Sequence, residues 1–251
     1  MSDFDRNVAA RGFGATRAAI DVGLRAYMLR VYNYMAAGVA LTGVVAWFTY
    51  NAAVVTDATG RITGLTSFGQ TIFSGPLTIV LFLATLGIVF FMSFRIDRLQ
   101  PSTALMLFMG YAALLGLMLS SVFLAYTGAS ITRTFFISAA SFGALSLYGY
   151  TTQRDLSPIG SFLIMGLFGL ILAMVVNIFL KSTGLDFAIS AIGVLIFAGL
   201  TAWDTQKIKE MYSVNDDGTV AGRKAVMGAL TLYLDFINLF LFLLRFMGDR
   251  R

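Results

Sequence analysis

Two residue types are missing from the chain altogether, cysteine and histidine. Without cysteine there can be no disulfide framework, no thiolate metal site and no cysteine nucleophile. Without histidine the chain lacks the one side chain that ordinarily titrates near neutral pH, which is also the commonest protein metal ligand. Any function linked to protons near neutral pH must therefore use carboxyl groups in unusual surroundings.

Charged residues are also scarce. They make up 12% of the 251 residues, whereas hydrophobic residues make up 58%, and a soluble domain carries about 25% charged residues. This composition predicts an integral membrane protein. The net charge of +5 fits basic residues that flank membrane spans. No basic patch interleaved with aromatic residues is present, so we expect no nucleic-acid partner.

Long hydrophobic runs dominate most of the sequence. A helix that crosses a bilayer needs about 20 mostly apolar residues, and seven runs meet or approach that length. They predict an all-α polytopic membrane protein with one transmembrane domain, residues 29–248. A basic cytosolic tail, residues 1–28, precedes it, and a short tail, residues 249–251, follows it. The expected spans lie near residues 31–50, 76–94, 103–126, 134–150, 159–180, 187–204 and 225–246.

The connections between the spans predict an orientation. With the N-terminus in the cytosol, the inside segments carry twelve basic residues and the outside loops carry three, a bias that favours a cytosolic N-terminus. The one long outside loop, residues 51–74, is expected to be a solvated connector without a site. Three arginines near the C-terminus would then lie outside. Basic residues on the outside run against the rule that places them in the cytosol, which leaves open whether the seventh run spans fully or is re-entrant.

Two aspartates interrupt the apolar runs. Asp204 closes the sixth run and Asp235 lies inside the seventh; we call them the aspartate pair. A charged side chain at the centre of a membrane helix costs about 2.5–3.5 kcal/mol, so such residues commonly face a protein or water interior and serve a function. The sixth and seventh helices are expected to be antiparallel neighbours with the two acids at similar depth. The carboxyl groups should then meet and share one proton near neutral pH.

A shared proton would make the aspartate pair a pH-sensitive latch and gate. Protonated, the pair joins two helices by a hydrogen bond; ionised, the carboxylates repel each other and can bind a cation. The alternative is a purely structural pair that a nearby arginine satisfies. Arg98 and Arg95 are the candidates for that basic partner, because both lie on the connection after the second span and have long side chains that can snorkel.

Two more polar residues are candidates to line a cation pathway at the pair. Asn238 is three residues after Asp235 on the same helical face, and Thr205 follows Asp204. Together with two carboxylates they supply fewer than the 6–8 oxygen ligands that calcium prefers. A calcium site at the pair would therefore be weak, which suits passage better than storage.

Several motifs resemble the Bax inhibitor family, the transmembrane Bax-inhibitor-motif proteins. The resemblance covers residues 29–248 and is most specific in LTLYLDFINLFLFLLRFMG, residues 230–248. It is supported by AWDTQKIKEMY at 202–212, FGALSLYGYTTQRDLSPIG at 142–160 and GPLTIV at 75–80. The resemblance implies six helices around a hydrophobic last helix and a pH-sensitive calcium leak governed by two aspartates. By motif these are Asp204 and Asp235, with Arg98 as the basic partner and Arg95 as its rival.

Three functions remain open from the sequence. The first is a leak for calcium and protons in a bacterial inner membrane, with no enzymatic activity and no cofactor. The second is a non-catalytic regulator that binds another membrane protein, such as the membrane-bound protease that some bacterial relatives modulate. The third is an intramembrane aspartyl protease, faintly suggested by Tyr233–Asp235. It is disfavoured because Asp204 follows Ala-Trp and no Pro-Ala-Leu element is present.

Overall fold

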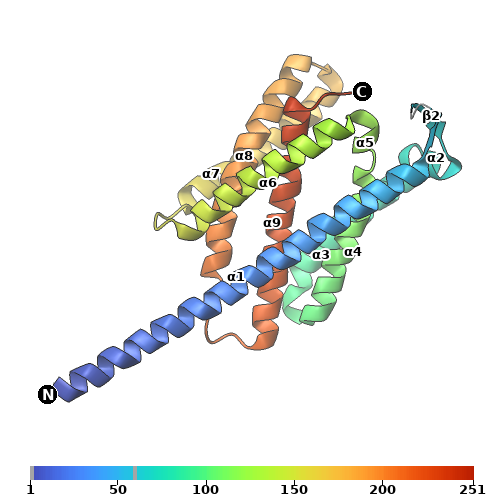
Figure 1. Cartoon of the computed structure of the whole chain (residues 1–251). Coiled ribbons are helices and arrows are strands. Elements are labelled where there is room, and N and C mark those ends of the chain that lie inside the picture. The colour runs from blue at the N-terminus through green and yellow to red at the C-terminus, as the bar shows by residue number, and fades with distance from the viewer. Residues whose placement is uncertain (1–2, 59–60) are drawn as a thin grey trace.

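The computed structural model describes residues 3–58 and 61–251, with side chains from Val22 onward, and shows a bundle of long helices (Figure 1). Two short strands and three short helices lie in the connections. In chain order the elements are α1 (Asp3–Ala53), β1 (Val54–Thr56), β2 (Ile62–Leu65), α2 (Ser67–Phe73), α3 (Leu77–Arg95), the 3-10 helix η1 (Ile96–Arg98), α4 (Pro101–Leu119), α5 (Val122–Ala125), α6 (Gly128–Thr151), α7 (Ser157–Leu180), α8 (Thr183–Glu210) and α9 (Gly218–Met247).

Six helical segments within the described part of the chain are long and apolar enough to cross a bilayer. They lie at residues 22–53, 77–98, 101–125, 157–180, 183–210 and 218–247. The protein is therefore an integral membrane protein. The fourth expected span corresponds to α6, which has 24 residues but is too polar to be among the six. The expected count of seven spans is not confirmed.

The last helix is the most buried one. In its most apolar 18-residue stretch 61% of the residues are buried, and α9 packs against α1, α4, α6 and α8. The helices α3 and α7 lie further out, because α3 packs mainly on α4 and α7 mainly on α8. The predicted ring of six helices around α9 is therefore not confirmed; four helices form its close neighbours.

The seventh run forms one continuous helix. At 1.5 Å per residue the 30 residues of α9 extend about 45 Å, which exceeds the hydrocarbon core of about 30 Å. The helix ends at Met247, and the residues after it lie beside those that follow α5: Thr127 donates its backbone N–H to the carbonyl oxygen of Asp249 at 3.2 Å. This shape favours a full span over a re-entrant segment.

The structure adds detail to the long outside loop and to the N-terminal tail. Residues 51–74 are not a plain connector, since β1 and β2 pair as an antiparallel hairpin and α2 follows it, N-capped by Thr66. The expected basic tail, residues 1–28, is helical from Asp3 onward. The helix α1 begins at Asp3 and continues without a break into the apolar stretch that starts at Val22, and its first turns project beyond the bundle (Figure 1).

Candidate functional site: a buried aspartate pair

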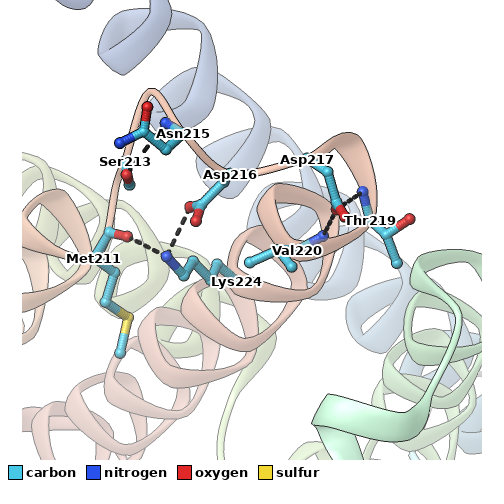
Figure 2. Close-up of polar contacts among 8 residues, drawn as sticks. All are labelled: Met211, Ser213, Asn215, Asp216, Asp217, Thr219, Val220 and Lys224. Atoms are coloured by element: carbon cyan, nitrogen blue, oxygen red, sulfur yellow. Dashed lines mark hydrogen bonds and ion pairs between the residues drawn. The ribbon is translucent and has the colours of Figure 1, made fainter.

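The turn between α8 and α9 fixes how these two helices face each other (Figure 2). Asp217 caps α9, because its Oδ1 accepts backbone N–H groups from Thr219 at 2.8 Å and Val220 at 2.7 Å. Lys224, one turn further along α9, donates to the carbonyl oxygen of Met211 at 2.9 Å and to Oδ2 of Asp216 at 2.7 Å. One lysine thus joins α9 to the end of α8 and to the loop, which sets the register of the antiparallel pair.

Small residues bring the neighbouring backbones close together. A Cβ atom on Gly228 of α9 would lie 2.9 Å from the side chain of Ile208 on α8. A Cβ atom on Gly149 of α6 would lie 2.1 Å from the carbonyl oxygen of Ala202 on α8. Small residues allow this close approach of helices in lipid, where packing is a main driving force for association. The segment of α8 that carries Asp204 is therefore held tightly between α6 and α9.

The structure brings the aspartate pair into contact. The carboxyl groups of Asp204 and Asp235 lie within hydrogen-bonding contact of each other, and the residues are only 8% and 5% exposed. Oδ2 of Asp235 is fully buried, and no N–H or O–H group of a described residue other than the pair itself donates to it. Two carboxylates cannot donate, so a hydrogen bond between them needs one proton on the pair.

The two arginines expected beside the pair do not reach it. Arg95 and Arg98 are both exposed, and within the described part of the chain neither forms an ion pair with an aspartate of the pair. Arg95 ends α3, which packs mainly on α4, whereas Arg98 ends η1, which contacts α9. The charge that acts on Asp204 comes from Lys207, three residues further along α8. Lys207 is itself exposed, with Nζ 5.0 Å from the ring centroid of Trp203.

Thr205 and Asn238 face away from each other. Thr205 is fully buried, and its hydroxyl donates to the carbonyl oxygen of Thr201 at 2.8 Å and contacts Oγ of Ser146 at 2.9 Å. Asn238 donates to the carbonyl oxygen of Leu234 at 2.8 Å and lines a cavity of about 440 Å³ between α7, α8 and α9. Asn238 thus lies one turn from Asp235 beside a cavity, whereas Thr205 belongs to the contact with α6.

Sequence reasoning missed two buried polar contacts around the site. Tyr32 of α1 contacts Oγ of Ser146 at 2.7 Å, so Tyr32, Ser146 and Thr205 form one chain of hydroxyl groups across three helices. Further along, the hydroxyl of Thr42 donates to the carbonyl oxygen of Ala112 at 2.8 Å and lies 2.6 Å from the hydroxyl of Tyr233. The sequence of α6 does contain a pattern that could have predicted the contact between Tyr32 and Ser146. Buried hydroxyl residues recur along one face of α6 at spacings of four or eight residues: Ser130, Thr134, Ser138 and Ser146.

The pair alone cannot form a tight metal site. Among the described residues no group of three or more acidic side chains comes together, so two carboxylates are the charged ligands on offer at Asp204 and Asp235. Calcium prefers 6–8 oxygen ligands. Chemically, the arrangement can hold and release a proton, and once ionised it can attract a cation weakly.

Comparison with known proteins agrees with the motifs. A sequence profile of the family described as inhibitor of apoptosis-promoting Bax1 matches residues 24–251. An uncharacterised protein of Rickettsia prowazekii is 52% identical over the full length of both chains. The inner membrane protein YbhL of Escherichia coli is 48% identical over 91% of this chain and 94% of its own. An uncharacterised protein of Caulobacter vibrioides is 44% identical over the full length of both. The chain therefore belongs to the Bax inhibitor family of membrane proteins.

Proposed function

We propose that the protein is a pH-gated leak for cations, calcium in particular, in a bacterial inner membrane, and that the aspartate pair is its gate. One observation carries the proposal. Two carboxyl groups from adjacent helices, Asp204 of α8 and Asp235 of α9, contact each other in buried positions within segments apolar enough to span a membrane. Intramembrane acids of this kind commonly serve ion or proton pathways.

The contact supplies a closed state. With one proton, the two carboxyl groups hold α8 and α9 together by a hydrogen bond, and no arginine neutralises the charge that remains within the described part of the chain. Lys207 attracts negative charge to Asp204, and Asp235 is the more buried of the two. The shared proton is therefore expected on Asp235, with Asp204 as the acceptor.

Loss of the proton supplies the open state. Two carboxylates in contact at low dielectric repel each other strongly, which separates the two helices and exposes negative charge to an entering cation. The cavity that Asn238 lines, on the side of α7, begins about one helical turn from Asp235, although neither aspartate lines it. Rising pH should therefore increase cation flux. The passage involves no covalent step and no cofactor, and two carboxylates bind calcium weakly enough to release it.

Calcium flux into proteoliposomes, measured with an internal indicator between pH 5 and 8, tests this proposal. The wild-type protein should show flux that rises with pH. Asp235→Asn should lose most of that dependence, because an asparagine amide donates a hydrogen bond to Asp204 at any pH. Asp204→Asn should behave similarly. As a matched control, Asp97→Asn removes an exposed acid in η1 and should preserve the wild-type profile.

Two outcomes would contradict the gate. Full pH dependence in the double variant Asp204→Asn/Asp235→Asn would place the sensor elsewhere and leave the pair a structural role. Absence of flux from folded wild-type protein at every pH would argue against a leak. Binding of a partner membrane protein that survives in the same double variant would then favour a regulator.

A further inference from the structure

A cleft runs between α1 and α6, two helices that make little direct contact among the described residues. Its first part, of about 560 Å³, lies in the half nearer the α8–α9 turn and is lined by Arg25, Tyr32 and Met35 of α1 and by Phe142, Gly143 and Tyr150 of α6, among others. A second cavity, of about 380 Å³, lies further along the same two helices beside α5, with Phe236 and Phe240 of α9 in its wall. Cavities thus lie between α1 and α6 at two levels of the bundle.

Two polar groups in the lining of the first part already have hydrogen-bond partners within the protein. The hydroxyls of Tyr32 and Ser146 in its lining bond to each other at 2.7 Å, and the Ser146 hydroxyl also bonds to that of Thr205 at 2.9 Å. The remaining lining is largely aliphatic and aromatic. Along α6 the side of Gly143 is open, because a Cβ atom there would have no neighbour within 4 Å. An apolar occupant therefore fits better than a polar solute.

The mouth of the cleft is positively charged. Arg25 is exposed and lines the cleft, and it has no ion-pair partner among the side chains that the structure describes. On the α6 side, Lys209 donates to the carbonyl oxygen of the lining residue Tyr150 at 2.8 Å, and its Nζ lies 5.6 Å from the ring centroid of the same tyrosine. This end lies at the α8–α9 turn, since the rings of Tyr27 and Tyr212 are 5.7 Å apart. Basic and aromatic residues gather in this way at a membrane interface.

We infer that this cleft binds an anionic phospholipid of the surrounding bilayer, with one acyl chain between α1 and α6 and the headgroup phosphate at Arg25. The occupant follows from position and charge. The cleft lies between membrane-embedded helices, so hydrocarbon chains are the apolar molecules around it, and its charged mouth matches an acidic headgroup. The inference does not depend on the leak, because it concerns a different face of the bundle from the aspartate pair.

Photolabelling in proteoliposomes tests the inference. A trace of phosphatidylglycerol or phosphatidylcholine that carries a diazirine in its acyl chain is added to the proteoliposomes. The sample is then irradiated, and the labelled peptides are identified by mass spectrometry. Label should concentrate on the α1 and α6 residues that line the cleft. The anionic lipid should label them about fivefold more than the zwitterionic one, which is the effect of one basic residue near a membrane surface. Arg25→Gln should remove that preference, whereas Arg30→Gln, exposed and outside the cleft lining, should retain it.

A second variant separates occupancy from folding. Gly143→Phe places a ring in the open space of the cleft and should abolish the label on α1 and α6. Gly169→Phe is the matched control, because Gly169 of α7 also has open space around it and is exposed, yet lines none of the described cavities. Label spread evenly over all outer helices, or label unchanged by Gly143→Phe, would overturn the inference. Crosslinks between two copies of the chain through the cleft would do the same.

Discussion

The helices α6 and α7 both have 24 residues, yet they relate to the rest of the bundle in opposite ways. Only 6% of the most apolar stretch of α7 is buried, and α7 packs mainly on α8. By contrast, α6 packs on both α8 and α9 and turns a row of serines and threonines inward. In a membrane, lipid solvates the apolar helix, so the more polar helix of the two is the one that needs protein partners.

The same reasoning accounts for the last helix. With 61% of its apolar stretch buried, α9 is enclosed by four other helices and can carry Asp235 among apolar residues. Hydropathy along the sequence therefore indicates membrane insertion, whereas burial inside the bundle follows from small and polar residues. The contrast between α6 and α7 can be tested at matched positions in the two helices.

The largest difference is expected for a glycine in each helix. Gly149→Ala in α6 should lower the free energy of unfolding by about 3 kcal/mol, because the new methyl group would overlap backbone atoms of Ala202. Gly169→Ala in α7 meets open space and should leave stability unchanged or slightly raised. Unfolding in mixed detergent micelles, followed by circular dichroism, measures both. Equal effects of the two substitutions would show that α6 is not held between neighbours.

A smaller difference is expected for a serine in each helix. Ser146→Ala should lower the free energy of unfolding by about 1 kcal/mol, because it breaks the contacts with Tyr32 and Thr205. Ser161→Ala in α7 removes only a bond within its own helix, at 3.0 Å to the carbonyl oxygen of Ser157, on an exposed face, and should have almost no effect. The same unfolding assay compares them. A full loss of 1 kcal/mol in Ser161→Ala would contradict the lipid-facing placement of α7.

Much of the fold follows from the sequence for the same physical reasons. A run of about 20 apolar residues has few alternatives to a spanning helix, because the bilayer leaves no other way to satisfy the backbone. The matches between runs and helices are therefore close, as for 159–180 and α7. The choice of neighbours is harder. It depends on single close approaches such as Gly149 with Ala202, which apolar periodicity does not encode.

The candidate site likewise has one part that the sequence predicts and one part that it does not. The placement of Asp204 and Asp235 on adjacent antiparallel helices followed from their position in the apolar runs, and the structure brings them into contact. The basic residue beside the pair, Lys207, was not predicted from the sequence, which favoured Arg98 or Arg95. A long side chain such as Arg98 can reach in many directions, so its partner depends on the packing of α3, whereas Lys207 is tied to Asp204 by the helix they share.

The smallest effect concerns the start of α7, where the chain leaves the loop after α6. Asp155 accepts the backbone N–H of Ser157 at 2.8 Å, and this hydrogen bond lowers the pKa of its carboxyl group below the usual value of 3.8. A carboxyl group whose pKa is lower in the folded state contributes stability above its unfolded pKa and loses it as the pH falls through the folded pKa.

Acidification from pH 6 to pH 3 should therefore destabilise the wild-type protein slightly more than Asp155→Asn, whose amide oxygen still accepts the bond but does not titrate. The midpoint of thermal unfolding in detergent across this pH range measures the difference. Identical slopes for the two proteins would show that this bond does not distinguish the folded from the unfolded state.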